Sequence, residues 1–438
     1  MFNAAQNLLD NSLPKGVTDF LPEQAEKIGF IENIISKTFE LWGFRKIIPP
    51  MIEFEELLAV GMDDSLREKS FRFEDRQSHK LLAIPPDITP QVARIESMRM
   101  AGYPLPHRLY YNSRVLRHVE SQSGRSRELY QSGVELIGLD SPEADAETIA
   151  MSVEALKKIG FPGFKIDLGQ VEFFKGIIAA AGLDNVTTAL IQSAVARKDT
   201  SAVKEAVESL SITDFSKREI LALPRLFGGK EVLDKAASIV GNDQSKRALD
   251  NLFQIIDILE IHGIKDDLTI DLGEIRGLAY HTGVTFEGFV PGLGEPVCGG
   301  GRYDSLMARY GRSCPATGFA FNVLNLLHAY EKMGGCEIVK PPVILIFNMN
   351  SNRADALSLA SGLRLQGFPV ARDIIRRDID QSLAYSRQMG IGFIVVIPEN
   401  DLRDNNLEVI RVENSVKNYV KMSDLMADAT SIFKTRNN

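Results

Sequence analysis

A chain of 438 residues, 44% hydrophobic and 25% charged, is long enough for two or three globular domains and lacks the composition of a disordered protein. The net charge of −8 disfavours a broad nucleic-acid-binding surface, which would need an excess of basic residues. Three cysteines without a close CxxC pair disfavour a disulfide framework or thiolate zinc site, and no apolar run approaches the roughly 20 residues that span a bilayer, so we expect a cytoplasmic protein.

The N-terminal part of the chain is predicted to combine helices with antiparallel strands. Residues 22–41 carry apolar side chains at helical spacing behind a proline, which indicates a helix. The sequence after it, RKIIPPMIEF, is extended and broken by two prolines. The remaining predicted elements are a hairpin over 69–84, a helix over 86–102, strands over 107–119 and 128–138, and a helix over 141–160.

The middle of the chain is predicted to be almost wholly helical from about 173 to 262, which we interpret as an insertion into the sheet domain. Strands return at 268–273 and 282–290. The segment 295–311, EPVCGGGRYDSLMARYG, is predicted to be a strand, a glycine turn and a helix, and 315–333 leads into another helix. We therefore expect an α+β domain over 1–335 rather than a doubly wound parallel sheet.

The last hundred residues have a different pattern. From about 340 to 438 the sequence shows short apolar strands alternating with helices in βαβαβ order, followed by a strand and a helix. This part is predicted to be a separate small α/β domain.

Polar residues gather around the segment 115–135. On an extended strand Gln131, Gly133 and Glu135 share one face, and Arg117 lies on the neighbouring strand. Arginines 117, 125 and 127 are suited to a phosphate or carboxylate because a guanidinium recognises both through paired hydrogen bonds. A solvated hairpin loop explains the same charges equally simply.

A second candidate is the segment RGLAYHTG, with Arg276, Tyr280 and His281 beside glycines. A lone histidine among apolar residues is more often a hydrogen-bonded packing residue than a functional group, and no ligand set at metal spacing accompanies it. The segment CGGGRYD either holds an anion or lets strands pack closely. In IPPDITP, Asp87 and Thr89 either cap a helix or place an acid beside a ligand ammonium.

Taken in order, these segments resemble the core of the class II aminoacyl-tRNA synthetases, and specifically the histidine branch. The resemblance covers about residues 14–330 and implies an antiparallel sheet domain with a helical insertion, and a dimer formed through the first motif. The C-terminal domain resembles an anticodon-binding domain. The matching segments are GFRKIIPPMIE, FRFEDR, IPPDIT, VLRHVESQSGRSRELYQSGVE, RGLAYHTG, GGGRYD and PATGFAFNVLNLL.

The chain departs from the active ligases where the resemblance implies nucleotide contacts. Asn325 stands where the third motif has an arginine for the ATP triphosphate, and Val119 stands where the second motif has a glutamate. Asn325 cannot supply a cation to phosphate. RGLDYY of the ligases is RGLAYH, with Ala279 and His281 at the altered positions, and the Arg-Pro-Glu segment is Pro85-Pro86-Asp87.

The amino-acid side of the pocket is better preserved. The resemblance implies histidine contacts at eight positions, namely Asp87, Thr89, Arg117, Gln131, Glu135, Arg276, Tyr280 and His281. It favours a regulatory branch of the family without catalytic residues, cofactor or metal, whose members join separate catalytic subunits of a phosphoribosyltransferase in a hetero-oligomer and bind histidine as effector. A true histidine–tRNA ligase and a binding module for another process remain as alternatives, and tRNA and membrane partners are not expected.

Overall fold

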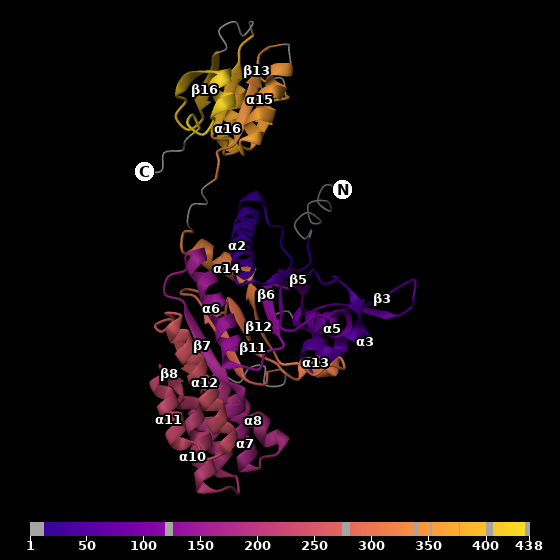
Figure 1. Ribbon diagram of the computed structural model, residues 1–438, viewed down its shortest axis with the longest axis vertical. Helices are drawn as coiled ribbons and strands as arrows, with labels where there is room; N and C mark the ends of the chain where they lie inside the picture. Colours follow the sequence, from indigo (N-terminus) through magenta and orange to yellow (C-terminus); the bar gives the residue numbers. More distant parts are fainter. Residues whose placement is uncertain are drawn as a thin grey trace, which may run out of the picture. The chain divides into compact units, whose positions relative to one another are not determined.

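The computed structural model describes residues 13–118, 126–273, 281–335, 340–350, 353–375, 377–399 and 406–433. The chain forms two compact units, Met1–Cys336 and Glu337–Asn438, and each is described by itself (Figure 1). Five of the positions named above fall outside the described residues, namely Val119, Arg125, Arg276, Ala279 and Tyr280.

The first unit is built on a sheet that has nine strands within its described residues, in the order β1-β5-β6-β12-β11-β10-β7-β9-β8. Its pairs are antiparallel except β1 with β5 and β7 with β9. This architecture confirms the predicted α+β class. The strands are β1 (Arg45–Lys46), β5 (His107–Leu116), β6 (Glu128–Ile137), β7 (Lys165–Gln170), β8 (Phe227–Gly228), β9 (Leu268–Asp271), β10 (Val284–Phe289), β11 (Cys298–Arg302) and β12 (Ala316–Asn322).

Alternation along strand β6 decides which face of the sheet each side chain occupies. Val134 and Leu136 pack in the large core with helix α2, whereas Ile137 packs in a second core with helix α5. Because neighbouring strand residues point to opposite faces, Glu135 lies on the α5 face. Both faces of β6 are covered, so Glu135 is buried together with its apolar neighbours on the strand.

Helices α2 (Pro22–Leu41), α6 (Pro142–Ile159) and α14 (Val323–Lys332) cover the face occupied by Val134 and Leu136, as Figure 1 shows. Helices α5 (Thr89–Arg99) and α13 (Leu306–Arg309) pack on the other face. The predicted helix over 22–41 is confirmed, and the buried residues Ile28, Ile31 and Ile35 recur on one side of it.

The predicted helical stretch is present and extends the large core away from the sheet. It consists of α7 (Val171–Ala181), α8 (Asn185–Ala196), α9 (Thr200–Glu208), α10 (Asp214–Ala222), a 3₁₀ turn (Leu223–Arg225), α11 (Glu231–Ile239) and α12 (Asp243–Ile261). Four of these helices begin with an Asp, Asn or Thr side chain that accepts a backbone N–H, at Asp184, Asp199, Thr213 and Asn242.

A small three-stranded sheet, β2-β4-β3, lies beside α5. Its strands β3 (Phe71–Glu74) and β4 (Leu81–Ile84) form the predicted hairpin, and β2 (Glu53–Phe54) pairs with β4. The short helices next to it are α3 (Glu55–Leu58), a 3₁₀ turn (Ala59–Gly61) and α4 (Asp64–Glu68).

The second unit holds a five-stranded sheet within its described residues, in the order β14-β13-β15-β16-β17. Strands β14, β13 and β15 pair in parallel, whereas β16 and β17 are each antiparallel to the strand before them in this order. Two strands therefore follow the βαβαβ unit, where the sequence predicted one. The elements are β13 (Ile344–Asn348), α15 (Ala354–Leu365), β14 (Val370–Arg372), α16 (Ile379–Gln388), β15 (Phe393–Ile397), β16 (Asn406–Arg411), β17 (Lys417–Lys421) and α17 (Met422–Ala427).

The predicted glycine turn at 299–301 is wrong, because these residues form the interior of strand β11. A Cβ at Gly300 would collide with the carbonyl oxygen of Gly318 on β12, so glycine is required for the two strands to approach. The segment that follows contains a strand, β12, before the predicted helix. Among the described residues, no helix is long and apolar enough to cross a membrane.

Candidate functional site

Five of the eight predicted site residues meet where β5 and β6 pass the start of α5. Thr89 begins α5, and its hydroxyl donates to Oε1 of Glu135 on β6 at 2.9 Å. Asp87, just before the helix, accepts from Nε2 of Gln131 at 2.8 Å. Asp87 and Thr89 are two positions apart at the start of α5, and Gln131 and Glu135 are four positions apart on one face of β6, so each residue of the first pair meets one of the second.

Glu135 is only 1% exposed and accepts hydrogen bonds from three hydroxyl groups. Besides Thr89, Tyr111 donates to Oε1 at 3.3 Å, and Tyr303 donates to Oε2. Gly318 on the neighbouring strand leaves room for the carboxylate, since a Cβ at that position would collide with Oε2. The three donors come from α5, β5 and the residue after β11, so the tertiary fold assembles the site.

Burial raises the pKa of the Glu135 carboxyl to about 8, because removal from water disfavours the charged form. The hydrogen bonds from Tyr303, Thr89 and Tyr111 oppose this effect, and the negative charge of Asp87 adds to it. A cationic or N–H-donating ligand beside Glu135 would restore the charged form. The buried carboxyl is thus suited chemically to a ligand group that carries positive charge.

Gln131 and Arg117 complete the group around Asp87. Arg117 donates through Nε to the carbonyl oxygen of Pro86 at 2.8 Å, and its Nη2 lies 3.9 Å from Oδ1 of Asp87. Gln131 Oε1 is buried and has no hydrogen-bond partner among the described residues. A buried acceptor without a partner is unfavourable and is suited to an N–H of a ligand.

The interpretation of Asp87 or Thr89 as a helix cap is wrong. Helix α5 begins after Ile88, which makes no side-chain capping bond, and Pro90 lies in its first turn. The side chains of Asp87 and Thr89 bond to Gln131 and Glu135 instead. The physical reason is that partners on β6 lie within reach and replace the local backbone bond.

His281 takes part in a different set of contacts. Its Nδ1 lies 3.3 Å from the carbonyl oxygen of Arg302, and Lys175 donates to the carbonyl oxygen of His281 at 3.1 Å. Burial lowers the pKa of the imidazole to about 4, so the ring is neutral at pH 7. The described contacts of His281 do not include the Asp87–Glu135 group, and its role as a ligand contact stays a prediction.

Arg302 is buried and held by protein groups. Its Nε lies 3.0 Å from Asp145 Oδ2, its Nη1 lies 3.0 Å from Asp304 Oδ1, and it also donates to the carbonyl oxygens of Leu139 and Ser141. Together with the glycines in β11, these bonds favour close strand packing over an anion site in the CGGGRYD segment. Among the described residues, no cluster of His, Cys, Asp and Glu could hold a metal ion.

Known proteins resemble this chain over nearly its whole length. A family model described as histidyl-tRNA synthetase matches residues 16–326, and one described as anticodon binding domain matches residues 343–430. A protein of Geobacter sulfurreducens named ATP phosphoribosyltransferase regulatory subunit is 56% identical over 424 residues, which are 97% of each chain.

The chain belongs to the histidyl-tRNA synthetase-like family of ATP phosphoribosyltransferase regulatory subunits.

Solved structures support this membership. The crystal structure of an ATP phosphoribosyltransferase regulatory subunit/histidyl-tRNA synthetase from Bacillus halodurans is 29% identical, with a TM-score of 0.76, and covers 86% of this chain and 96% of its own. Histidyl-tRNA synthetase from Nostoc sp. PCC 7120 is 20% identical with a TM-score of 0.82 and covers 96% and 99%. The second similarity shows that this chain has the fold of a histidyl-tRNA synthetase.

Asn325 lies in the first turn of α14 in this member of the regulatory-subunit family. Its side-chain amide donates to the carbonyl oxygen of Pro296 at 2.8 Å, so it ties the helix to the loop before β11. Because the amide of Asn325 is neutral, it supplies no positive charge at this position.

Sequence reasoning missed two residues of the site in this family member, Tyr111 and Tyr303. Both donate to Glu135 and both are almost fully buried. Tyr303 directly follows Arg302 in the GGGRYD segment, so its place beside a glycine-rich strand was the available signal. Tyr111 has no such signal, because only the pairing of β5 with β6 brings it beside Glu135.

Proposed function

We propose that the chain is a non-catalytic regulatory subunit of ATP phosphoribosyltransferase, the first enzyme of histidine biosynthesis. It would be required for the activity of a short catalytic subunit and would mediate feedback by histidine. The observation that carries this proposal is the 56% identity, over 97% of both chains, to a protein of that name. In this proposal the synthetase-like site is where the subunit would recognise an amino acid.

The arrangement of acceptors supports histidine as the effector. Asp87 and Glu135 can accept from an ammonium or an imidazole N–H, and Gln131 Oε1 is a third acceptor without a partner among the described residues. Thr89 and Arg117 hold the two carboxylates in place. Arg276, Tyr280 and His281 are proposed as further contacts on the family resemblance alone.

Loss of the nucleotide site supports the absence of catalysis. A ligase needs a cation for the triphosphate, and Asn325 stands at that position with its amide engaged by Pro296. The subunit therefore needs no cofactor or metal of its own in this proposal. Histidine would act by favouring one quaternary arrangement, with a coupling free energy of roughly 1–3 kcal/mol.

The proposed partners are the short catalytic subunit, in a hetero-octamer, and a second copy of the synthetase-like core. The segment after β1 supports the homodimer, because Ile48, Met51 and Ile52 expose large apolar side chains there. This is the segment that resembles the dimer-forming first motif of the synthetases.

Reconstitution with the short catalytic subunit of the same organism tests the proposal. The purified chain alone is expected to show no ATP–pyrophosphate exchange with histidine. Added to the catalytic subunit, the chain should raise the rate of phosphoribosyl transfer at least about tenfold. Histidine should lower that rate again, with a coupling free energy of roughly 1–3 kcal/mol. Turnover in the exchange assay, or no effect on the catalytic subunit, would contradict it.

A histidine–tRNA ligase is the second candidate. The anticodon-binding match over 343–430 favours it, as does the double name of the Bacillus halodurans relative. A ligase would bind tRNA with an affinity that falls steeply as salt increases. Absence of a tRNA mobility shift at low salt, together with absence of exchange, would eliminate this candidate.

A further inference from the structure

Helix α5 contacts both the proposed histidine site and the apolar segment that follows β1. Towards the sheet, Thr89 donates to Glu135 at 2.9 Å. Residues three apart on a helix share a side, and Gln91 and Arg94 both bond to residues 50–53. One helix of eleven residues therefore joins the proposed effector site to the segment proposed for the homodimer.

The bonds between α5 and this segment converge on Glu53. Arg94 donates through Nε to Oε2 of Glu53 at 2.8 Å and through Nη2 to Oε1 at 2.5 Å, a paired arrangement that fixes both groups. Gln91 donates through Nε2 to the same Oε1 and to the carbonyl oxygen of Pro50, each at 2.8 Å. Because Glu53 is buried, solvent screens this ion pair only weakly.

This polar bridge costs free energy that apolar packing would not. The carboxylate of Glu53 and the guanidinium of Arg94 both lose hydration. The oxygen Oε1 of Gln91 is buried and has no hydrogen-bond partner in the part of the chain that the structure describes. In return, directional bonds hold the segment in one position relative to α5, which apolar contacts do less strictly.

The two groups held by the bridge, the carbonyl of Pro50 and the carboxylate of Glu53, flank exposed apolar side chains. Met51 is 71% exposed and Ile52 is 45% exposed. These are side chains that the proposed function places in the homodimer. A displacement of α5 would therefore move them through the bridge.

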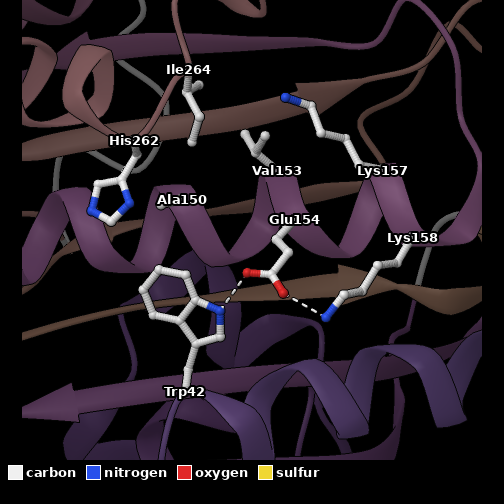
Figure 2. A pocket seen from close by; sticks show the side chains of 8 residues that line it. All are labelled: Trp42, Ala150, Val153, Glu154, Lys157, Lys158, His262 and Ile264. Carbon is white, nitrogen blue, oxygen red and sulfur yellow. Dashed lines mark hydrogen bonds and ion pairs between the residues drawn. The ribbon is translucent and has the colours of Figure 1, made fainter.

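The pocket drawn in Figure 2 shows a contrasting arrangement on the face of the sheet that Val134 occupies. Its eight lining residues come from the end of α2, from α6 and from the residues after α12. Trp42 donates to Glu154 at 2.7 Å, and Glu154 lies 2.5 Å from Lys158. These polar groups pair with one another, and none of the eight residues belongs to α5 or to the segment 48–54.

We infer that α5 links histidine binding to homodimer formation, with Gln91 and Arg94 as positioning residues that hold the segment 48–54 for a second copy. A ligand bonded to Glu135 fixes one side of α5, and a second copy seated on Met51 fixes the segment bonded to another side. Whichever binds second orders fewer groups, so each event favours the other. This inference rests on the proposed function, which supplies both histidine and the second copy.

The dissociation constant of the homodimer tests this link, measured by analytical ultracentrifugation of the whole chain with and without saturating histidine. Histidine should lower this constant at least about fivefold, the lower end of the usual coupling between two sites. Gln91→Met removes both Nε2 bonds of the bridge and keeps the pair of Arg94 with Glu53. It should reduce the effect of histidine on the dimer to within about twofold.

Gln366→Met is the matched control for Gln91→Met. Gln366 also donates through Nε2 to two backbone carbonyl oxygens, at 3.1 and 3.0 Å, but lies in the second unit, so the wild-type effect of histidine should remain. Arg94→Lys keeps a cation beside Glu53 without the paired geometry, and should weaken the effect as Gln91→Met does. Met51→Glu should raise the dimer dissociation constant at least about tenfold. Calorimetric titration with histidine verifies that each variant is folded.

A dimer dissociation constant that histidine leaves unchanged or raises would overturn the inference and leave the proposed function intact. A full effect of histidine in both Gln91→Met and Arg94→Lys would do the same, because the bridge would then carry no coupling. Wild-type dimerisation by Met51→Glu would overturn the inference together with the proposed dimer surface. A wild-type chain that binds no histidine would overturn the inference and the proposed effector.

Discussion

The hydroxyl of Tyr303 donates a hydrogen bond to Oε2 of Glu135, across 168 positions of the sequence. Thr89 and Tyr111 donate to the other oxygen, so three hydroxyls from separate elements hold one buried carboxyl. Such a cluster fixes the position of the group while burial keeps its pKa high. A ligand that brings a positive charge gains from both properties.

The stability of the protein should fall as pH rises from about 4.5 to about 8, owing to Glu135. The folded state holds this proton up to a pKa of about 8, whereas the unfolded chain releases it near the ordinary value of 4.5. The stabilisation by this proton is complete below pH 4.5 and is lost once the pH has passed about 8, a change on the order of 5 kcal/mol. Glu135→Gln should reduce this pH dependence in chemical denaturation between pH 5 and 8.5.

The control for this experiment is Glu208→Gln, at an exposed glutamate on α9. It should keep the pH dependence of the wild type. Equal slopes for Glu135→Gln and the wild type would show that Glu135 ionises normally in the folded protein.

Histidine affinity should rise with pH and level off above about pH 8. Below pH 8 Glu135 is protonated and must release its proton before the ligand can bind the carboxylate form. This cost weakens histidine binding by up to about tenfold for each pH unit. Tyr303→Phe removes a donor that favours the charged form, so its transition should move to higher pH and its affinity at pH 7 should fall. Calorimetry in two buffers of different ionisation enthalpy measures the proton released.

Tyr110→Phe is the matched control for Tyr303→Phe. Tyr110 lies on the opposite face of the sheet and donates to Glu40 at 2.9 Å. Its removal should leave the pH profile of histidine binding unchanged. A shift of the profile in both variants would point to general loosening of the sheet rather than to Glu135.

Gln131→Leu should separate stability from binding. The substitution removes the buried oxygen Oε1, which has no partner among the described residues, and it also removes the 2.8 Å hydrogen bond from Nε2 to Asp87. The two effects oppose each other, so the free energy of unfolding should change by no more than about 1 kcal/mol. Histidine affinity should fall roughly tenfold, the value of one hydrogen bond to a charged group. Denaturation and calorimetry on the same preparation test both parts. Unchanged affinity would remove Gln131 from the site.

Gly318→Ala should destabilise the protein by about 3 kcal/mol and abolish histidine binding. The added Cβ would collide with the Glu135 carboxylate and with the carbonyl oxygen of Val134. Gly29→Ala, inside helix α2 with no heavy atom within 4 Å of the added Cβ, should instead stabilise by about 0.5–1 kcal/mol. Thermal unfolding compares the two. Similar midpoints would mean that β12 and β6 tolerate a wider separation.

Much of the fold followed from local patterns. The helix over 22–41 shows its apolar periodicity directly, and the hairpin over 69–84 is marked by its polar turn. The glycines of β11 were misinterpreted as a turn because glycine permits a turn as readily as a close strand contact. Only the neighbouring strand β12 distinguishes the two.

The sequence by itself determined the alternation of β6, and therefore that Gln131 and Glu135 share a face. Tertiary structure decided what that face meets. Local sequence first indicated Asp87 and Thr89 as helix caps, but they bond to β6 because α5 packs there. Neither the third hydroxyl on Glu135 nor the high pKa of its carboxyl follows from local sequence, since both arise from burial among segments that are distant in the chain.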